Sequence, residues 1–136
     1  MTDEELWHAF GATTLPEKEW THRGHLRVAW LFSSRYPLDE AHVLMRVGII
    51  RLNAAHGLVE TAARGYHETI TRVWLAVVGA LMKEVPSESS AAFVDACGER
   101  LGREALLLHY SRERLASLEA RSRFVEPDRA PLPLRT

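Results

Sequence analysis

Two histidines stand three residues apart in the stretch WTHRGHL, residues 20–26, and a third stands in GYHETIT, residues 65–71. Two histidines from one helix and a third from a facing helix can form one metal coordination sphere, and neutral imidazole suits zinc, iron, copper and nickel. The candidate ligands of a divalent transition metal are therefore His22, His25 and His67. Three protein ligands with one open position are typical of a catalytic metal. HETIT is not the zincin motif, because Thr71 stands where the second histidine is needed.

The same residues also fit a polar pocket that holds no metal. Histidine and carboxylate side chains can act as general acids or bases, and an arginine can bind a substrate carboxylate. The candidate catalytic residues are Glu68 and Thr71. The candidate substrate-binding residues are Arg46, Asn53 and Arg121. In a third interpretation there is no site, the histidines hydrogen-bond the backbone or nearby hydroxyls, and Glu68 pairs with Arg72.

Helices must position these side chains, because apolar residues recur at helical spacing almost throughout and no stretch predicts a strand. The sequence predicts a single all-α domain over residues 1–136, a bundle of about five to six helices with an extended, proline-rich tail over residues 121–136. Predicted helices begin at Thr2 or Asp3, at Thr21 as N-cap, at Leu38, near Gly65, at Ser87 or Ser90, and at residue 103 with a break near Ser111.

A rotation of about 100° per residue predicts which side of each helix meets water. In the second helix both histidines turn inward. The fourth helix is apolar over most of its girth, which is typical of the central helix of a bundle; His67 and Thr71 face inward. Its predicted solvent stripe consists of Thr69, Arg72, Ala76 and Lys83.

The third helix leaves two orientations open. If its Glu40 and Arg51 side meets water, then Arg46 and Asn53 point inward. His42 has no partner signature and is expected at the surface or rim. An inward polar group costs roughly 1–3 kcal/mol unless it is hydrogen-bonded or ligated. We therefore expect a buried polar pocket where the second and fourth helices begin.

Composition excludes several partners. The 136 residues carry a net charge of −1, which gives no electrostatic case for nucleic acid or an anionic membrane surface. No apolar run approaches the roughly 18 residues of a membrane span, and MTDEELWHAF lacks the order of a signal peptide. The lone Cys97 cannot form an intramolecular disulfide, which fits a cytoplasmic location.

Three stretches, WTHRGHL, GYHETIT and HYSRERLASLEARSRFVEPD, resemble in order and spacing the motifs of a family of small bacterial proteins of uncharacterised function. The resemblance spans residue 20 to about residue 133. It implies no catalytic role, because the family carries no established reaction. It does imply shared motif positions at Thr21, His22, His25, His67, Glu68 and Thr71.

Three hypotheses of function follow. The first is a metal-binding protein, an enzyme that acts on a small molecule through its histidine cluster. The second is a metal-free small-molecule-binding or acid–base protein that uses the same pocket. The third is an interaction module without a site, such as a homodimer that buries one apolar helix face.

Overall fold

The computed structural model describes residues 1–133, and within them the chain is helical without a strand. The α-helices are α1 (Asp3–Gly11), α2 (His22–Arg35), α3 (Leu38–Ala55), α4 (Glu68–Glu84), α5 (Ser90–Cys97), α6 (Arg112–Leu115) and α7 (Leu118–Ser122). Short 3-10 helices are η1 (Glu17–Glu19), η2 (Gly98–Leu101) and η3 (Arg103–Leu108). The predicted all-α bundle is confirmed. In this part of the chain no helix is both long and apolar enough to span a lipid bilayer.

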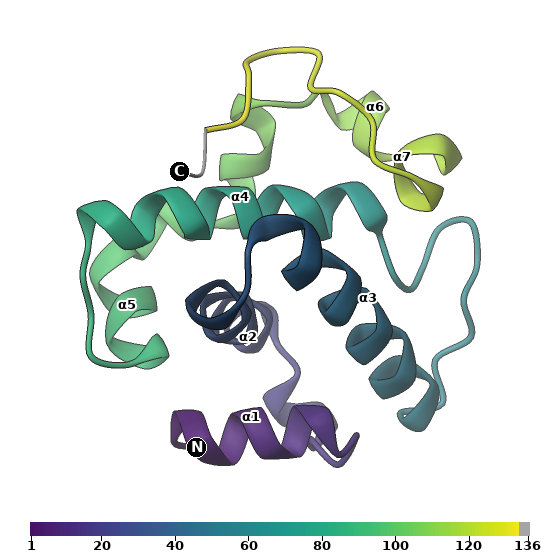
Figure 1. Ribbon diagram of the computed structural model, residues 1–136. Helices are drawn as coiled ribbons and strands as arrows, with labels where there is room; N and C mark the ends of the chain where they lie inside the picture. The colour runs from purple at the N-terminus through teal and green to yellow at the C-terminus, as the bar shows by residue number, and fades with distance from the viewer. Residues whose placement is uncertain (134–136) are drawn as a thin grey trace.

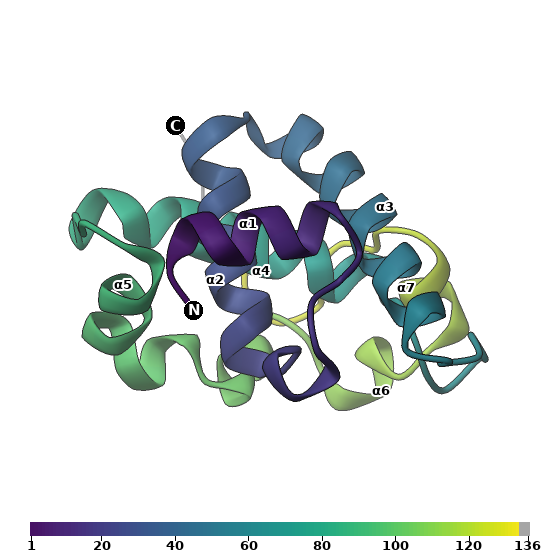
Figure 2. The ribbon, with the colours of Figure 1, turned by 90° about the horizontal axis from the view of Figure 1, so that it is seen from below.

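Helix α4 is the centre of the bundle, as its apolar girth predicts. It lies across the middle of the molecule, with α2 and α3 on one side and α6 and α7 on the other (Figure 1). It packs against α2, α3 and α7. Helix α1 crosses the far side of α2 (Figure 2). The starts of α2 and α4 are therefore both fixed by neighbours on several sides.

Polar N-caps set the first residue of most helices. The Thr21 hydroxyl accepts a hydrogen bond from the Gly24 N–H at 3.2 Å, so the predicted start of α2 is confirmed. Helix α5 begins at Ser90, the second of its two predicted starts, and its N-cap is Ser89, whose hydroxyl accepts from the Ala92 N–H at 3.1 Å. Helix α4 begins at Glu68, later than predicted, because the cap is the imidazole of His67.

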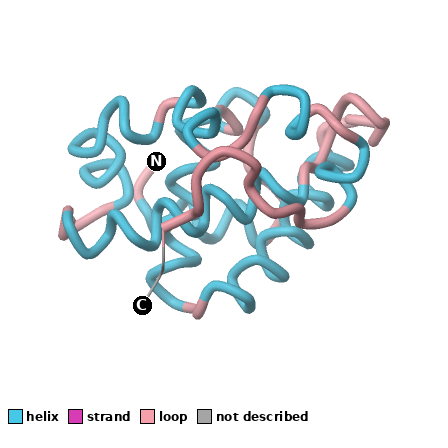
Figure 3. The backbone as a smooth tube through the Cα atoms, turned by 90° about the horizontal axis from the view of Figure 1, so that it is seen from above, coloured by secondary structure: helices cyan, strands magenta, loops and turns pink. Residues whose placement is uncertain are grey.

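The C-terminal segment is partly helical and packs on the bundle. Helix α7 reaches Ser122, so the prediction of an extended tail from residue 121 is wrong for its first two residues. Residues 123–133 then run without helix over the bundle (Figure 3), and Val125 is buried. The rest of the predicted tail, residues 134–136, lies outside the described residues.

This segment also explains an error in the predicted solvent stripe of α4. Thr69 and Ala76 are both buried. The Thr69 hydroxyl donates to the carbonyl of Arg123 at 3.0 Å and accepts from the N–H of Val125 at 3.2 Å. A periodicity computed within one helix cannot reveal that a distant segment covers its polar side.

Candidate functional site

The stretch WTHRGHL forms a tight entrance to α2. The rings of Trp20 and His25 stack, with centroids 3.6 Å apart and planes at 21°. A Cβ at Gly24 would lie 2.3 Å from the carbonyl oxygen of Glu19, so only glycine lets η1 approach α2 this closely. With the Thr21 cap, these contacts fix the rings of His22 and His25 at the helix start.

Each of these two histidines uses one ring nitrogen to hold its place. His22 donates from Nε2 to the carbonyl of Leu101 at 2.8 Å, and His25 donates from Nδ1 to the carbonyl of Thr21 at 2.7 Å. In a neutral imidazole the other nitrogen is then a hydrogen-bond acceptor. Within residues 1–133, Nδ1 of His22 and Nε2 of His25 have no hydrogen-bond partner.

Both histidines line a cavity of about 220 Å³ between α2, α3, α4 and η3. The rings of His22 and Trp74 are T-shaped to each other, with centroids 5.2 Å apart and planes at 60°. The remaining lining residues are Met45, Ile49, Ile70, Thr71, Arg103 and Leu106. Burial lowers the pKa of His25 to about 4, so its ring is neutral near neutral pH. Mostly apolar walls with a few convergent polar groups are typical of small-molecule sites.

His67 has a different role, because both of its ring nitrogens are already bonded. Nδ1 accepts from the N–H of Ile70 at 3.1 Å, and Nε2 donates to the carbonyl of Leu115 at 2.7 Å. Burial and the charge of Arg121 lower its pKa. The ring caps α4 and ties it to α6. His67 lines a neighbouring cleft of about 480 Å³ and does not line the cavity of His22 and His25.

The structure therefore brings two of the three candidate metal ligands to one cavity. Among residues 1–133 there is no group of three or more His, Cys, Asp or Glu side chains arranged to hold a metal ion. Thr71 reaches the same cavity, and its hydroxyl donates to the carbonyl of His67 at 2.8 Å.

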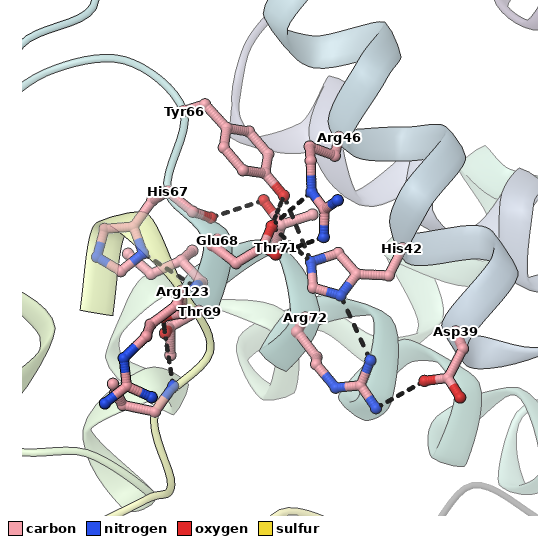
Figure 4. Close-up of polar contacts among 12 residues, drawn as sticks. Asp39, His42, Arg46, Tyr66, His67, Glu68, Thr69, Thr71, Arg72 and Arg123 are labelled. Atoms are coloured by element: carbon pink, nitrogen blue, oxygen red, sulfur yellow. Dashed lines mark hydrogen bonds and ion pairs between the residues drawn. The ribbon is translucent and has the colours of Figure 1, made fainter. Parts of the chain in front are cut away.

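Glu68 is the centre of a separate polar cluster between α3 and α4, which we call the Glu68 network; its members are Asp39, His42, Arg46, Tyr66, Glu68 and Arg72 (Figure 4). Arg46 binds both carboxylate oxygens of Glu68, with Nε at 2.9 Å from Oε1. The Tyr66 hydroxyl donates to Oε1 at 2.6 Å. His42 Nε2 lies 3.1 Å from the same oxygen. The carboxylate is thus saturated by protein donors.

The far side of His42 continues the network. Arg72 lies 3.4 Å from His42 Nδ1, and because a guanidinium only donates, the proton of the neutral ring is on Nε2. Arg72 also pairs with Asp39 at 2.9 Å. His42 is 4% exposed, so the prediction that it is a surface or rim residue is wrong. Its place on the same helical arc as Arg46 was the signal that could have revealed it.

The charges within the network are fixed by their partners. Burial alone would raise the pKa of Glu68, but hydrogen bonds from Arg46 and Tyr66 hold it below its ordinary value. Burial and the bond to Glu68 raise the pKa of Tyr66. Burial, aided by the charges of both arginines, lowers the pKa of His42. Glu68 is therefore ionised near neutral pH, and its charge is held by Arg46 and Tyr66.

The three candidate substrate-binding residues lie in three different places. The Glu40 and Arg51 side of α3 is exposed, so Arg46 and Asn53 point inward, as that orientation predicts. Arg46 binds Glu68, and Asn53 accepts from Trp20 Nε1 at 3.4 Å. Arg121 donates to the carbonyls at residues 65 and 66 and lines the cleft beside His67.

Sequence reasoning missed Arg103 and Arg112. Arg103 lines both the cavity and the cleft, and Arg112 lines the cleft. Arg103 lies outside the three motif stretches, and Arg112 lies within the third, where no spacing to another polar residue distinguishes it. The available signal for Arg103 was its position directly after Gly102, at the first residue of a predicted helix.

Comparison with models of protein families, with curated proteins and with solved structures finds nothing that matches this chain. The function must therefore be argued from the geometry of the site.

Proposed function

We propose that the protein binds a small organic molecule, without a metal, in the cavity lined by His22 and His25. One observation carries the proposal: each imidazole presents one nitrogen that no group in residues 1–133 bonds. Both side chains are half-buried, and a neutral imidazole nitrogen that carries no proton accepts hydrogen bonds. A ligand that donates hydrogen bonds would complete both rings.

The walls of the cavity narrow the choice of ligand. Trp74, Ile70 and Leu106 offer flat and branched apolar surface, which favours an unsaturated or aromatic body. His25 stays neutral down to about pH 4, so it serves as an acceptor and not as a general acid near neutral pH. The ligand therefore carries a hydroxyl or amino donor on an apolar body.

A metal is the second candidate, because two imidazole lone pairs in one cavity are a partial ligand set. Zinc, copper, nickel and iron all accept imidazole nitrogen. His67 could join only after giving up its cap and its bond to Leu115. A bound ion would thus rest on His22 and His25 and complete its shell with a ligand or water.

Calorimetric titration separates the two candidates. The probe for the organic ligand is para-aminobenzamide, which joins a flat apolar ring to amino donors. The metal probe is Zn²⁺ alone, with equilibrium dialysis as the readout. The proposal expects saturable binding of para-aminobenzamide that is weakened about tenfold or more in His25→Ala. His8→Ala, which removes an exposed histidine of α1, is the matched control.

Two results would decide against the proposal. Stoichiometric Zn²⁺ uptake that is lost in His25→Ala, without binding of the amide, would favour the metal. Equal amide affinity of the wild type and of His25→Ala would place any binding outside the cavity.

A further inference from the structure

We infer that the ligand carries an anionic group, a carboxylate or phosphate, which Arg103 binds at the junction of the cavity and the cleft. The inference rests on the proposed function and deepens it by naming the class of ligand. It starts from a residue that neither the motifs nor the Glu68 network involve.

Arg103 is placed to reach a ligand in the cavity. It lines the cavity together with His22 and His25, and it lines the neighbouring cleft. Its guanidinium forms no hydrogen bond or ion pair with another group in residues 1–133. By contrast, Arg46 and Arg72 are both paired with carboxylates. The guanidinium N–H groups of Arg103 are therefore available to bind two oxygens of a carboxylate or phosphate.

The cleft reinforces the positive field around Arg103. Its charged lining residues are three arginines, Arg103, Arg112 and Arg121, against a single carboxylate, Glu104. The NH1 group of Arg121 donates to two backbone carbonyls. Because a carbonyl carries no net charge, the positive charge of Arg121 is not neutralised there. Arg112 makes no ion pair with any group in residues 1–133. Such a one-sided set attracts anions.

The electrostatics of His25 agree with this arrangement. Burial is the main cause of its low pKa, and the positive charge of Arg103 adds to it. The positive charge of Arg103 therefore acts on the ring of His25, which lines the same cavity. A ligand with a donor for the histidines and an anionic end for Arg103 would span a cavity of about 220 Å³. A cavity of this volume can hold a ring of six atoms with one substituent at each end.

A matched pair of probes tests the charge alone. Para-aminobenzoate and para-aminobenzamide share the ring and the amino donor but differ in charge. We expect the benzoate to bind about tenfold more tightly than the amide at low salt, and added salt to reduce that difference. Phenyl phosphate is a third probe, which distinguishes a phosphate preference from a carboxylate preference.

The variants Arg103→Ala and Arg103→Gln assign the effect to one residue. Each should lower the affinity for para-aminobenzoate about tenfold and that for para-aminobenzamide by a clearly smaller factor, because only the benzoate carries a charge. Arg51→Ala, which removes an exposed arginine of α3, is the control and should change neither affinity. Thermal unfolding of each variant checks that the fold is intact.

The outcomes separate this inference from the proposed function. If amide and benzoate bind equally well and His25→Ala weakens both, the cavity is a binding site but the anion inference is overturned. The same holds if Arg103→Ala leaves the benzoate affinity unchanged. If none of the three probes binds the wild type at about 10 mM, both the anion inference and the proposed function fail.

Discussion

The Glu68 network and the His22–His25 cavity are built from similar side chains but differ in how complete they are. In the network, Arg46, Tyr66 and His42 all contact one carboxylate. In the cavity, His22 and His25 each keep one nitrogen without a partner in residues 1–133. A network whose members satisfy each other specifies the fold. An incomplete one leaves capacity for a ligand.

The histidines show the same contrast within one residue type. His42 and His67 have both nitrogens bonded and a pKa lowered by burial. His22 and His25 are anchored by one nitrogen only. The functional distinction between these residues thus lies in their second nitrogen, which spacing in the sequence does not reveal.

The largest effect is expected when the network is broken at its centre. Glu68→Ala leaves the guanidinium of Arg46 and the hydroxyl of Tyr66 without their acceptor in a half-buried place. We expect the free energy of unfolding to fall by about 3 kcal/mol, because the buried His42 loses the same acceptor as the partly exposed Arg46 and Tyr66. Urea denaturation measures it, with the exposed Glu113→Ala as control. A loss below about 1 kcal/mol would mean that the network is not structural.

The next largest loss of stability is expected for His67→Ala. It removes the cap on the Ile70 N–H and the bond to the Leu115 carbonyl, which together contribute about 2 kcal/mol. His67→Asn should recover about half of this loss, because asparagine caps helices well but is too short to reach α6. Urea denaturation of both variants tests the assignment. Equal stability of the alanine and asparagine variants would contradict the capping role.

Acidification should weaken the fold through the buried histidines. His25, His42 and His67 have lowered pKa values in the folded state, so the unfolded chain binds protons first as pH falls below about 6.5. Each of these histidines then lowers the free energy of unfolding by up to about 1.4 kcal/mol per pH unit. For His25 this loss continues down to about pH 4, where the folded protein also binds the proton. The lowered pKa of Glu68 acts in the same direction below about pH 4.5.

Urea denaturation across this pH range tests that sign. The wild type should lose stability between about pH 6.5 and pH 5, and His67→Asn should show a smaller slope. A free energy of unfolding that rises on acidification would mean that these rings are protonated in the folded protein.

The smallest loss of stability is expected in the cavity. His25→Ala removes one hydrogen bond and the stack on Trp20, worth about 1 kcal/mol together, and creates no unpaired buried charge. It should nonetheless abolish most of the affinity for para-aminobenzamide. A loss of stability as large as that of Glu68→Ala would contradict the claim that the cavity contributes less to the fold than the Glu68 network does.

The sequence predicts what is decided within a helix. The cap at Thr21, the central place of α4 and the inward side of α2 follow from local chemistry and periodicity. Contacts between distant segments are beyond its reach. Thr69 is buried because residues 123–125 cover it, and His67 is saturated because Leu115 lies beside it. Whether Arg103 is paired depends on every neighbour in space, so no pattern in one chain reveals it.

The most direct test follows the ring resonances of His22, His25, His42 and His67 by NMR while para-aminobenzamide is added. The account predicts that the signals of His22 and His25 shift with one common saturation curve. Those of His42 and His67 should stay in place, because their nitrogens are bonded within the protein. Shifts confined to His42 or His67, or no shift in any of the four, would contradict the claim that the unpartnered nitrogens mark the binding site.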